Sequence, residues 1–376
     1  MIDEQVIEPI TQEELPIPRN QKAVLLASVV GFLILGLGGG ILLFKKNTST
    51  LEKVDQVVDQ VQTQTANVLT SPSPTPFSFQ EMTIPYLRQR SYTSQLGPQE
   101  KIGETSTYTS YLTSYTSDGL KVNGLLTQPK GEQPIGGFPA IVFIHGYIPP
   151  ARYQTRTQYE AYVDYLARNG FVVFKIDLRG HGQSEGEAGG GYYSSDYIVD
   201  ALNARAALQA SNFVNKDKVG MWGHSMAGNI TMRALASQPE IPAIAIWGGA
   251  VYTYEDMQEY GIDDNSYQAP SSTSPSRQKR QQLFDTHGQF NPESAFWKQV
   301  PATNYLNEIK GAVGLFHAVN DDVVSVEYSR GLKIKLDASN IPNELNEYPN
   351  GGHNISGTAF SQAMRDTVDF FNQHLQ

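Results

Sequence analysis

From residue 140 onward, short and mainly apolar runs alternate with segments that carry the hydrophobic spacing of a helix. The apolar runs cover residues 140–144, 171–176, 219–222, 243–247 and 312–316. Each run is short and lacks a polar face, which is typical of a strand that is buried on both sides. Because parallel strands are joined by helical crossovers, this alternation predicts an α/β fold with a mostly parallel sheet covered by helices on both faces.

Helices and one hairpin can be placed around these runs. Apolar residues repeat with helical spacing over residues 159–166, and Asn169-Gly170 then forms a typical helix stop. The same spacing predicts helices around residues 198–208 and 360–371. Ahead of the first run, two segments rich in strand-forming residues flank Asp118-Gly119 and predict an antiparallel hairpin.

A candidate nucleophile lies between the strand at residues 219–222 and the helix that follows it. Residues 223–227 read Gly-His-Ser-Met-Ala, with Gly228 next. A sharp strand-to-helix turn needs small residues around its central serine and holds the serine hydroxyl above the sheet. Ala227 stands where glycine is usual, which is a mild departure. We therefore predict Ser225 as a nucleophile; the alternative is a glycine-rich turn with an incidental serine.

A serine nucleophile needs a base, and the base needs a third group to orient it. In this architecture the acid and then the histidine follow the serine along the chain. Asp321 lies in the loop after the strand at residues 312–316, with Asp322 as its competitor, and His353 lies on a glycine-rich loop. We predict Ser225, Asp321 and His353 as the catalytic residues; a solvated loop histidine is the alternative for His353.

Stabilisation of an oxyanion requires two hydrogen-bond donors. One is predicted to be the backbone N–H of Met226, which follows the nucleophile at a helix N-terminus. The other should come from the loop after the first apolar run, at residues 145–150, where Pro149 and Pro150 have no N–H to offer. Among the remaining donors of that loop we predict Tyr147.

Taken in order, these segments resemble the α/β-hydrolase fold over residues 105–374. Within that fold the chain is most similar to the catalytic domains of the prolyl-oligopeptidase and dienelactone-hydrolase-like group. The resemblance rests on the loop at residues 145–147, on Asp-Leu-Arg-Gly-His-Gly-Gln-Ser at residues 177–184, and on the Ser225, Asp321 and His353 segments. It implies a serine hydrolase that cleaves an ester or peptide bond without a metal or organic cofactor. It also implies that residues 177–184 form a structural turn, that His224 merely precedes the nucleophile and that His317 occupies a strand end.

The segment at residues 251–301 is an insertion between two predicted strands. Prolyl oligopeptidases screen substrates with a large propeller, for which this chain has no room, so substrate control is expected in the insertion. It is rich in aromatic residues, namely Tyr252, Tyr254, Tyr260, Tyr267, Phe284, Phe290, Phe296 and Trp297. We predict a helical lid whose aromatic side chains face Ser225 and form an apolar pocket. The alternative is a surface insertion with no role in catalysis.

The N-terminal part is organised differently. Residues 1–22 form a polar tail, and residues 23–44 carry no charge before Lys45 and Lys46. A stretch of about 20 apolar residues can span a bilayer, and no cleavage site for a signal peptide follows it. We predict a single transmembrane helix at residues 23–44, a juxtamembrane helix and Ser/Thr/Pro-rich linker at residues 45–80, and a hydrolase domain at residues 81–376.

The orientation of this anchor is decided by the linker. Positive charges flank the span almost equally, whereas a Ser/Thr/Pro-rich tether is typical of extracytoplasmic segments, so we expect the hydrolase domain outside the cytoplasm. Gly36 and Gly40 form a small-xxx-small pair, and a heptad-like pattern follows. With fewer than three heptads we expect a lone anchor followed by a frayed helix; weak self-association through the anchor is the alternative.

Charge and cysteine content narrow the function further. The net charge of −10 makes nucleic acid a poor partner. The chain has no cysteine, so a thiol nucleophile and thiolate metal sites are excluded. The expected protein is a membrane-anchored serine hydrolase whose activity rises between about pH 6 and 8 as its histidine loses a proton. The alternatives are an acyltransferase with the same triad and a non-catalytic binding protein that keeps the fold.

Overall fold

The structure is a computed structural model that describes residues 76–375. The predicted tail, transmembrane helix and most of the linker, at residues 1–75, lie outside the described residues. Residues from Pro76 to the C-terminus form one compact unit. Between residues 76 and 375, no helix has the length and hydropathy of a membrane span.

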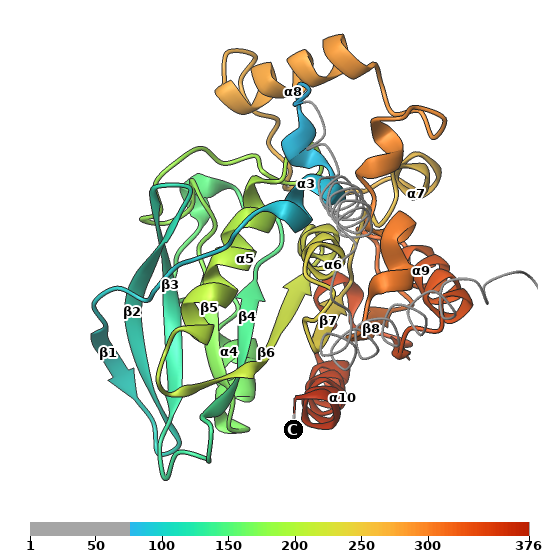
Figure 1. Ribbon diagram of the computed structural model, residues 1–376. Coiled ribbons are helices and arrows are strands. Elements are labelled where there is room, and N and C mark those ends of the chain that lie inside the picture. Colours follow the sequence, from blue (N-terminus) through green and yellow to red (C-terminus); the bar gives the residue numbers. More distant parts are fainter. Residues whose placement is uncertain (1–75, 376) are drawn as a thin grey trace, which may run out of the picture. The chain divides into compact units, whose positions relative to one another are not determined.

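The strands of the described residues form one sheet in the order β1-β2-β3-β5-β4-β6-β7-β8-β9 (Figure 1). They are β1 (Glu100–Glu104), β2 (Tyr108–Ser117), β3 (Leu120–Pro129), β4 (Phe138–Ile144), β5 (Val172–Ile176), β6 (Val214–His224), β7 (Ala243–Trp247), β8 (Ala312–Ala318) and β9 (Asn343–Tyr348). All neighbours from β5 to β9 pair in parallel, which confirms the predicted mostly parallel sheet.

The predicted hairpin is confirmed as the antiparallel pair β2–β3. Asp118 and Gly119 both have positive φ, 54° and 79°, which is the backbone of a type I′ turn that follows the twist of the strands. β3 in turn pairs antiparallel with β5 and joins the hairpin to the parallel part of the sheet.

The chain order of the central strands brings two loops together. The chain runs from β4 to β5 on one side and returns to β6 on the other side of β4. Ile144 at the end of β4 lies opposite Gly223 near the end of β6. Because ligands of open α/β sheets bind where the strand order reverses, the loops after β4 and β6 are expected to border a site.

The helices are α3 (Ile84–Gln89), α4 (Glu160–Arg168), α5 (Asp196–Gln209), α6 (Ala227–Ser237), α7 (Tyr254–Tyr260), α8 (Pro275–His287), α9 (Glu327–Ala338) and α10 (Thr358–His374). Short 3₁₀ turns are η1 (Gln80–Met82), η2 (Pro150–Arg152), η3 (Trp297–Gln299), η4 (Ala302–Glu308) and η5 (Gly352–Asn354). Buried side chains of α5, α6 and α9 belong to one core cluster, and those of α4 and α10 belong to another. Val142 and Phe143, adjacent on β4, join different clusters, so both faces of the sheet are covered as predicted.

Residues ahead of the hairpin pack onto this fold. Met82, Ile84 and Leu87 are fully buried, and Arg88 Nε donates a hydrogen bond of 2.7 Å to the carbonyl of Ala236, next to the end of α6. Arg233 donates to the carbonyl of Met82. The N-terminal segment is therefore anchored to α6 from about residue 82 onward.

The insertion at residues 251–301 contains α7, α8 and η3, drawn in light orange and orange in Figure 1. Its aromatic rings pack on one another: the Tyr254 ring lies 5.1 Å from that of Phe290 and 5.3 Å from that of Trp297 between centroids. Aromatic side chains bury large areas and stabilise such clusters by mutual contact. These rings belong to the same core cluster as the buried side chains of α5, α6 and α9, so the insertion packs onto the main fold.

Candidate active site

Ser225 lies in the sharp turn between β6 and α6. Its φ of 56° places it in the left-handed region, which is rare for residues other than glycine. Its N–H donates to the carbonyl of Trp247 at 2.9 Å, and its carbonyl accepts from the N–H of Gly228 at 2.8 Å. The neighbouring strand and the first turn of α6 therefore hold a strained backbone that presents the serine at the edge of the sheet.

The small residues around Ser225 follow from close packing. A Cβ atom on Gly223 would lie 2.8 Å from Thr231 Cγ2, and one on Gly228 would lie 2.8 Å from the Cα atom of Gly249. Both distances are too short for a real side chain. Ala227 is fully buried and fits its position, which explains how alanine replaces the usual glycine there.

The loops of Asp321 and His353 meet beside this turn. His353 Nδ1 lies 2.8 Å from Asp321 Oδ2, while Asp321 Oδ1 accepts hydrogen bonds of 2.9 Å from the backbone N–H groups of Val323 and Val324. Burial alone would raise the pKa of Asp321, but hydrogen bonds from His317 and His353 outweigh it and hold that pKa well below its usual range. Asp321 is therefore ionised. Asp322 is exposed and lines the cavity instead of contacting His353.

His317 is a contact of Asp321 that the sequence did not reveal. Its Nε2 lies 3.2 Å from Asp321 Oδ2 and 2.9 Å from the carbonyl of Val324, while its Nδ1 lies 2.7 Å from Ser329 Oγ. A carbonyl oxygen can only accept, so Nε2 carries a hydrogen. His317 thus gives the buried carboxylate a second imidazole donor. The only sequence signal for this contact is that His317, at the end of β8, and Asp321, in the loop after it, are four residues apart.

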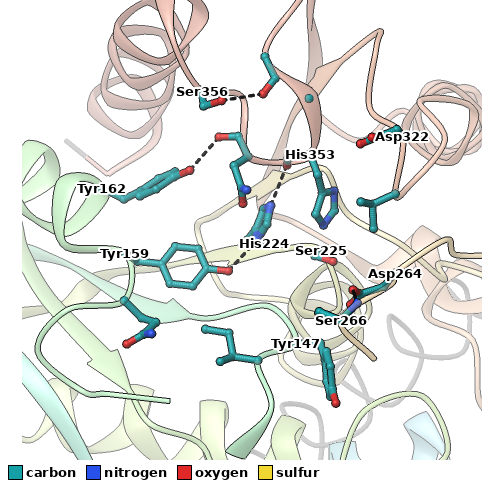
Figure 2. Close-up of a pocket in the computed structure, with 16 residues that line it drawn as sticks. Tyr147, Tyr159, Tyr162, His224, Ser225, Asp264, Ser266, Asp322, His353 and Ser356 are labelled. Atoms are coloured by element: carbon teal, nitrogen blue, oxygen red, sulfur yellow. Dashed lines mark hydrogen bonds between the residues drawn. The ribbon is translucent and has the colours of Figure 1, made fainter. Parts of the chain in front are cut away.

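Ser225 and His353 open into a cavity of about 630 Å³. Figure 2 shows Ser225 next to His353, with Tyr147, Tyr159 and Tyr162 along the same cavity. From the insertion at residues 251–301, Asp264 and Ser266 line the cavity, whereas none of its eight predicted aromatic residues does. The expectation of an aromatic wall facing Ser225 is therefore wrong for this cavity. Rings such as Tyr254, Phe290 and Trp297 pack on one another instead, while Tyr267 is exposed and lies beside Tyr147.

The predicted oxyanion donors lie at the same edge of the sheet. Tyr147 lines the cavity, and Met226 is the residue between Ser225 and the start of α6. The neighbouring N–H of Gly146 is already engaged, since it donates to the Tyr159 hydroxyl at 3.0 Å. Ser225 Oγ forms no hydrogen bond to another described residue, but it lines the same cavity as His353. Over residues 76–375, no group of His, Asp and Glu side chains could hold a metal ion.

The sheet order, the strained turn at Ser225 and the Asp321–His353 pair are those of a serine hydrolase with the α/β-hydrolase fold. Residues 139–271 match the family model described as "Serine aminopeptidase, S33". The chain is 26% identical over 250 residues to the uncharacterized peptidase YtmA of Bacillus subtilis (strain 168), an alignment that covers 65% of this chain and 85% of YtmA. It is 24% identical over 275 residues to the uncharacterized peptidase YuxL of the same organism, covering 69% of this chain but 38% of YuxL.

Solved structures share the fold. Acetyl xylan esterase 1 from Thermoanaerobacterium sp. JW/SL YS485 superposes with a TM-score of 0.53 at 20% identity, covering 82% of this chain and 98% of the esterase. The acylaminoacyl peptidase of Pyrococcus horikoshii gives a TM-score of 0.52 at 18% identity, covering 72% of this chain and 42% of the peptidase. Both an esterase and a peptidase are thus built on this architecture.

Proposed function

We propose that Ser225, Asp321 and His353 form the catalytic triad of a membrane-anchored hydrolase that cleaves an ester or peptide bond through an acyl-enzyme. The observation that carries the proposal is the hydrogen bond of 2.8 Å between His353 Nδ1 and Asp321 Oδ2 at the cavity into which Ser225 opens. A histidine that donates from Nδ1 has its Nε2 free to accept a proton from a serine hydroxyl.

The chemistry follows from these positions. Ser225 Oγ attacks the substrate carbonyl while His353 Nε2 takes its proton. The ionised Asp321 stabilises the imidazolium that forms, and the backbone N–H groups of Tyr147 and Met226 stabilise the negative oxygen of the tetrahedral intermediate. His353 then protonates the leaving group, and water releases the acyl group by the reverse sequence of proton transfers.

The substrate class is an ester or a short peptide. YtmA and YuxL are both described as peptidases, which favours peptide-bond cleavage. The fold shared with esterases does not favour either reaction, since one triad serves both. The cavity of about 630 Å³ suits a small acyl group or short peptide. The loop at residues 261–268 supports a role of the insertion as a lid, because Asp264 and Ser266 reach the cavity from it.

The membrane anchor and the extracytoplasmic location are also part of the proposal. Their support is the charge-free stretch at residues 23–44 and the Ser/Thr/Pro-rich linker that follows it. Gly36 and Gly40 support weak self-association of the anchor. Protease treatment of intact cells would remove the hydrolase domain if it lies outside the cytoplasm and spare it if it lies inside.

A fluorophosphonate probe and a panel of p-nitrophenyl esters and aminoacyl amides test the triad. Ser225→Ala is expected to abolish labelling and to lower kcat by at least about 1,000-fold, because it removes the nucleophile. Ser266→Ala, which changes another serine of the same cavity, is the matched control and should still be labelled. Equal labelling of wild type and Ser225→Ala would refute the assignment. Products formed with added alcohols or amines distinguish hydrolysis from acyl transfer.

A further inference from the structure

Three hydrogen bonds run in series along one wall of the cavity. The N–H of Gly146 donates to the hydroxyl of Tyr159 at 3.0 Å. That hydroxyl lies 2.7 Å from His224 Nδ1, and His224 Nε2 lies 2.9 Å from the backbone carbonyl of His353. Figure 2 shows the last two bonds as dashed lines that cross from Tyr159 through His224 to the His353 backbone.

The series has one consistent direction. The carbonyl of His353 can only accept, so His224 Nε2 carries the hydrogen. The Nδ1 of a neutral imidazole is then unprotonated and accepts from the Tyr159 hydroxyl, whose oxygen in turn accepts from Gly146 N–H. Every donor and acceptor in the series is satisfied by this arrangement.

Burial keeps both side chains in these protonation states. His224 is 3% exposed, and burial, aided by the neighbouring His353, lowers its pKa to about 3. Burial also raises the pKa of Tyr159 far above neutrality, so its hydroxyl keeps its proton. His224 therefore does not compete with His353 for the proton of Ser225.

The geometry around Tyr159 is tight and strained. Tyr159 has a φ of 59°, in the left-handed region, although it is a bulky residue. A Cβ atom on Gly146 would lie 3.0 Å from both His224 Nδ1 and the Tyr159 hydroxyl, so only glycine fits there without displacement. The Tyr159 ring also packs edge-on against Phe143 of β4 at 5.4 Å between centroids.

These contacts join three segments that are distant in the chain: the loop after β4, the turn of Ser225 and the loop of His353. We propose that Tyr159 and His224 are positioning residues that hold the loop of Gly146 and Tyr147 and the backbone of His353 in register with Ser225. This inference rests on the proposed function. It gives His224, which the sequence placed only as the residue before the nucleophile, a defined part in assembling the site.

Tyr159→Phe removes the hydroxyl at the centre of the series and keeps the ring. We expect kcat for an activated ester to fall about 10- to 100-fold with KM within about 3-fold, because small displacements of reacting groups lower the rate more than they weaken binding. Tyr115→Phe is the control. Its hydroxyl donates to the carbonyl of Asp200 at 2.9 Å and is buried, so it loses a comparable hydrogen bond away from the cavity.

Two substitutions of His224 refine the test. The side-chain amide of His224→Gln can still donate to the His353 carbonyl, whereas His224→Leu can neither donate nor accept. We expect kcat to decrease from wild type to His224→Gln to His224→Leu. Adding Tyr159→Phe to His224→Leu should lower kcat no more than about 2-fold further, because interacting residues give non-additive effects.

The thermal midpoint Tm of each variant in the full-length protein separates positioning from folding. The proposal is overturned if Tyr159→Phe and Tyr115→Phe lose similar Tm and both keep wild-type kcat. It is also overturned if the effects of Tyr159→Phe and His224→Leu on kcat multiply. If Tyr159→Phe does not fold, the comparison of His224→Gln with His224→Leu decides alone. Activity that survives in Ser225→Ala would instead refute the proposed function itself.

Discussion

At the scale of single residues, Gly248 shows how closely the site is packed. It follows β7, has a φ of 50° and lies directly behind the Asp321–His353 pair. A Cβ atom there would lie 3.1 Å from the carbonyl of His353 and 3.3 Å from both Asp321 Oδ2 and His353 Nδ1. Any side chain at this position would push against the hydrogen bond that orients the imidazole.

We therefore expect Gly248→Ala to lower kcat about 10- to 100-fold through displacement of His353. The positive φ adds about 1 kcal/mol of destabilisation. Gly119→Ala in the β2–β3 turn is the control, since Gly119 has a φ of 79° but nothing within 4 Å of its added Cβ. Steady-state kinetics and Tm of both variants check the prediction; equal kcat in the two would contradict it.

Sequence reasoning about single residues is most specific where the chemistry is local. Ser225 could be predicted because a turn between strand and helix requires small neighbours, and these are adjacent in the chain. Asp321 is the predicted acid, but Asp322 stays a competitor because adjacent residues share one sequence context. Only the contact of 2.8 Å with His353 distinguishes Asp321.

At the scale of elements, the loop between α7 and α8 links the insertion to the cavity. The N–H of Asp263 donates to the carbonyl of Val323 at 2.9 Å. At the other end, the N–H of Gln268 donates to the Tyr147 hydroxyl at 2.9 Å, and the rings of Tyr147 and Tyr267 lie 5.3 Å apart between centroids. The loop is therefore attached to both the Asp321 segment and the predicted oxyanion loop.

Tyr147→Phe separates this attachment from oxyanion binding, because it removes the hydroxyl and keeps the backbone N–H. One lost hydrogen bond is worth about 1 kcal/mol, so we expect KM for long acyl esters to rise about 5-fold. The acetyl ester is the internal control, and its KM and kcat should change less than about 2-fold. A chain-length series of p-nitrophenyl esters measures both, and a uniform change across the series would argue against a lid.

Elements with a strong hydrophobic pattern were predictable, and short polar ones were not. The apolar run at residues 243–247 predicts a strand with the same bounds as β7. A strand that is buried at every position has an unbroken apolar sequence, which makes its bounds visible. β1 reads Glu-Lys-Ile-Gly-Glu at the edge of the sheet and has no such pattern. The short helix α3 is stabilised by its packing on α6. That contact joins residues far apart in the chain, so the sequence around α3 does not indicate it.

At the scale of the whole molecule, the buried histidines predict that the folded state loses stability as the pH falls. Burial lowers the pKa of His145 and of His181, and it lowers that of His224 to about 3. In the unfolded chain each would titrate near pH 6.5. Below that pH the unfolded state binds protons that the folded state does not, so stability is present above about pH 6.5 and is lost as pH falls.

Each of these histidines contributes up to about 1.4 kcal/mol per pH unit in that window. We expect Tm of the full-length protein in detergent to fall between pH 6.5 and 4.5 and to be nearly constant above pH 7. Trp222, Trp247 and Trp297 are fully buried and report unfolding by fluorescence. His224→Gln should show a shallower decline than wild type. A Tm that is flat across this range would refute the prediction.

The sequence by itself determined the class of fold, the predicted hairpin and the order of the candidate catalytic segments. These follow from hydrophobic periodicity and turn chemistry, which act between residues close in the chain. The tertiary structure decided which carboxylate meets His353 and that His317 supports it. It also decided that Tyr159 contacts His224 across 65 residues and that Tyr254 and Trp297 of the insertion pack on each other. Such contacts depend on sheet register and on how loops from different strands meet, and no local pattern encodes them.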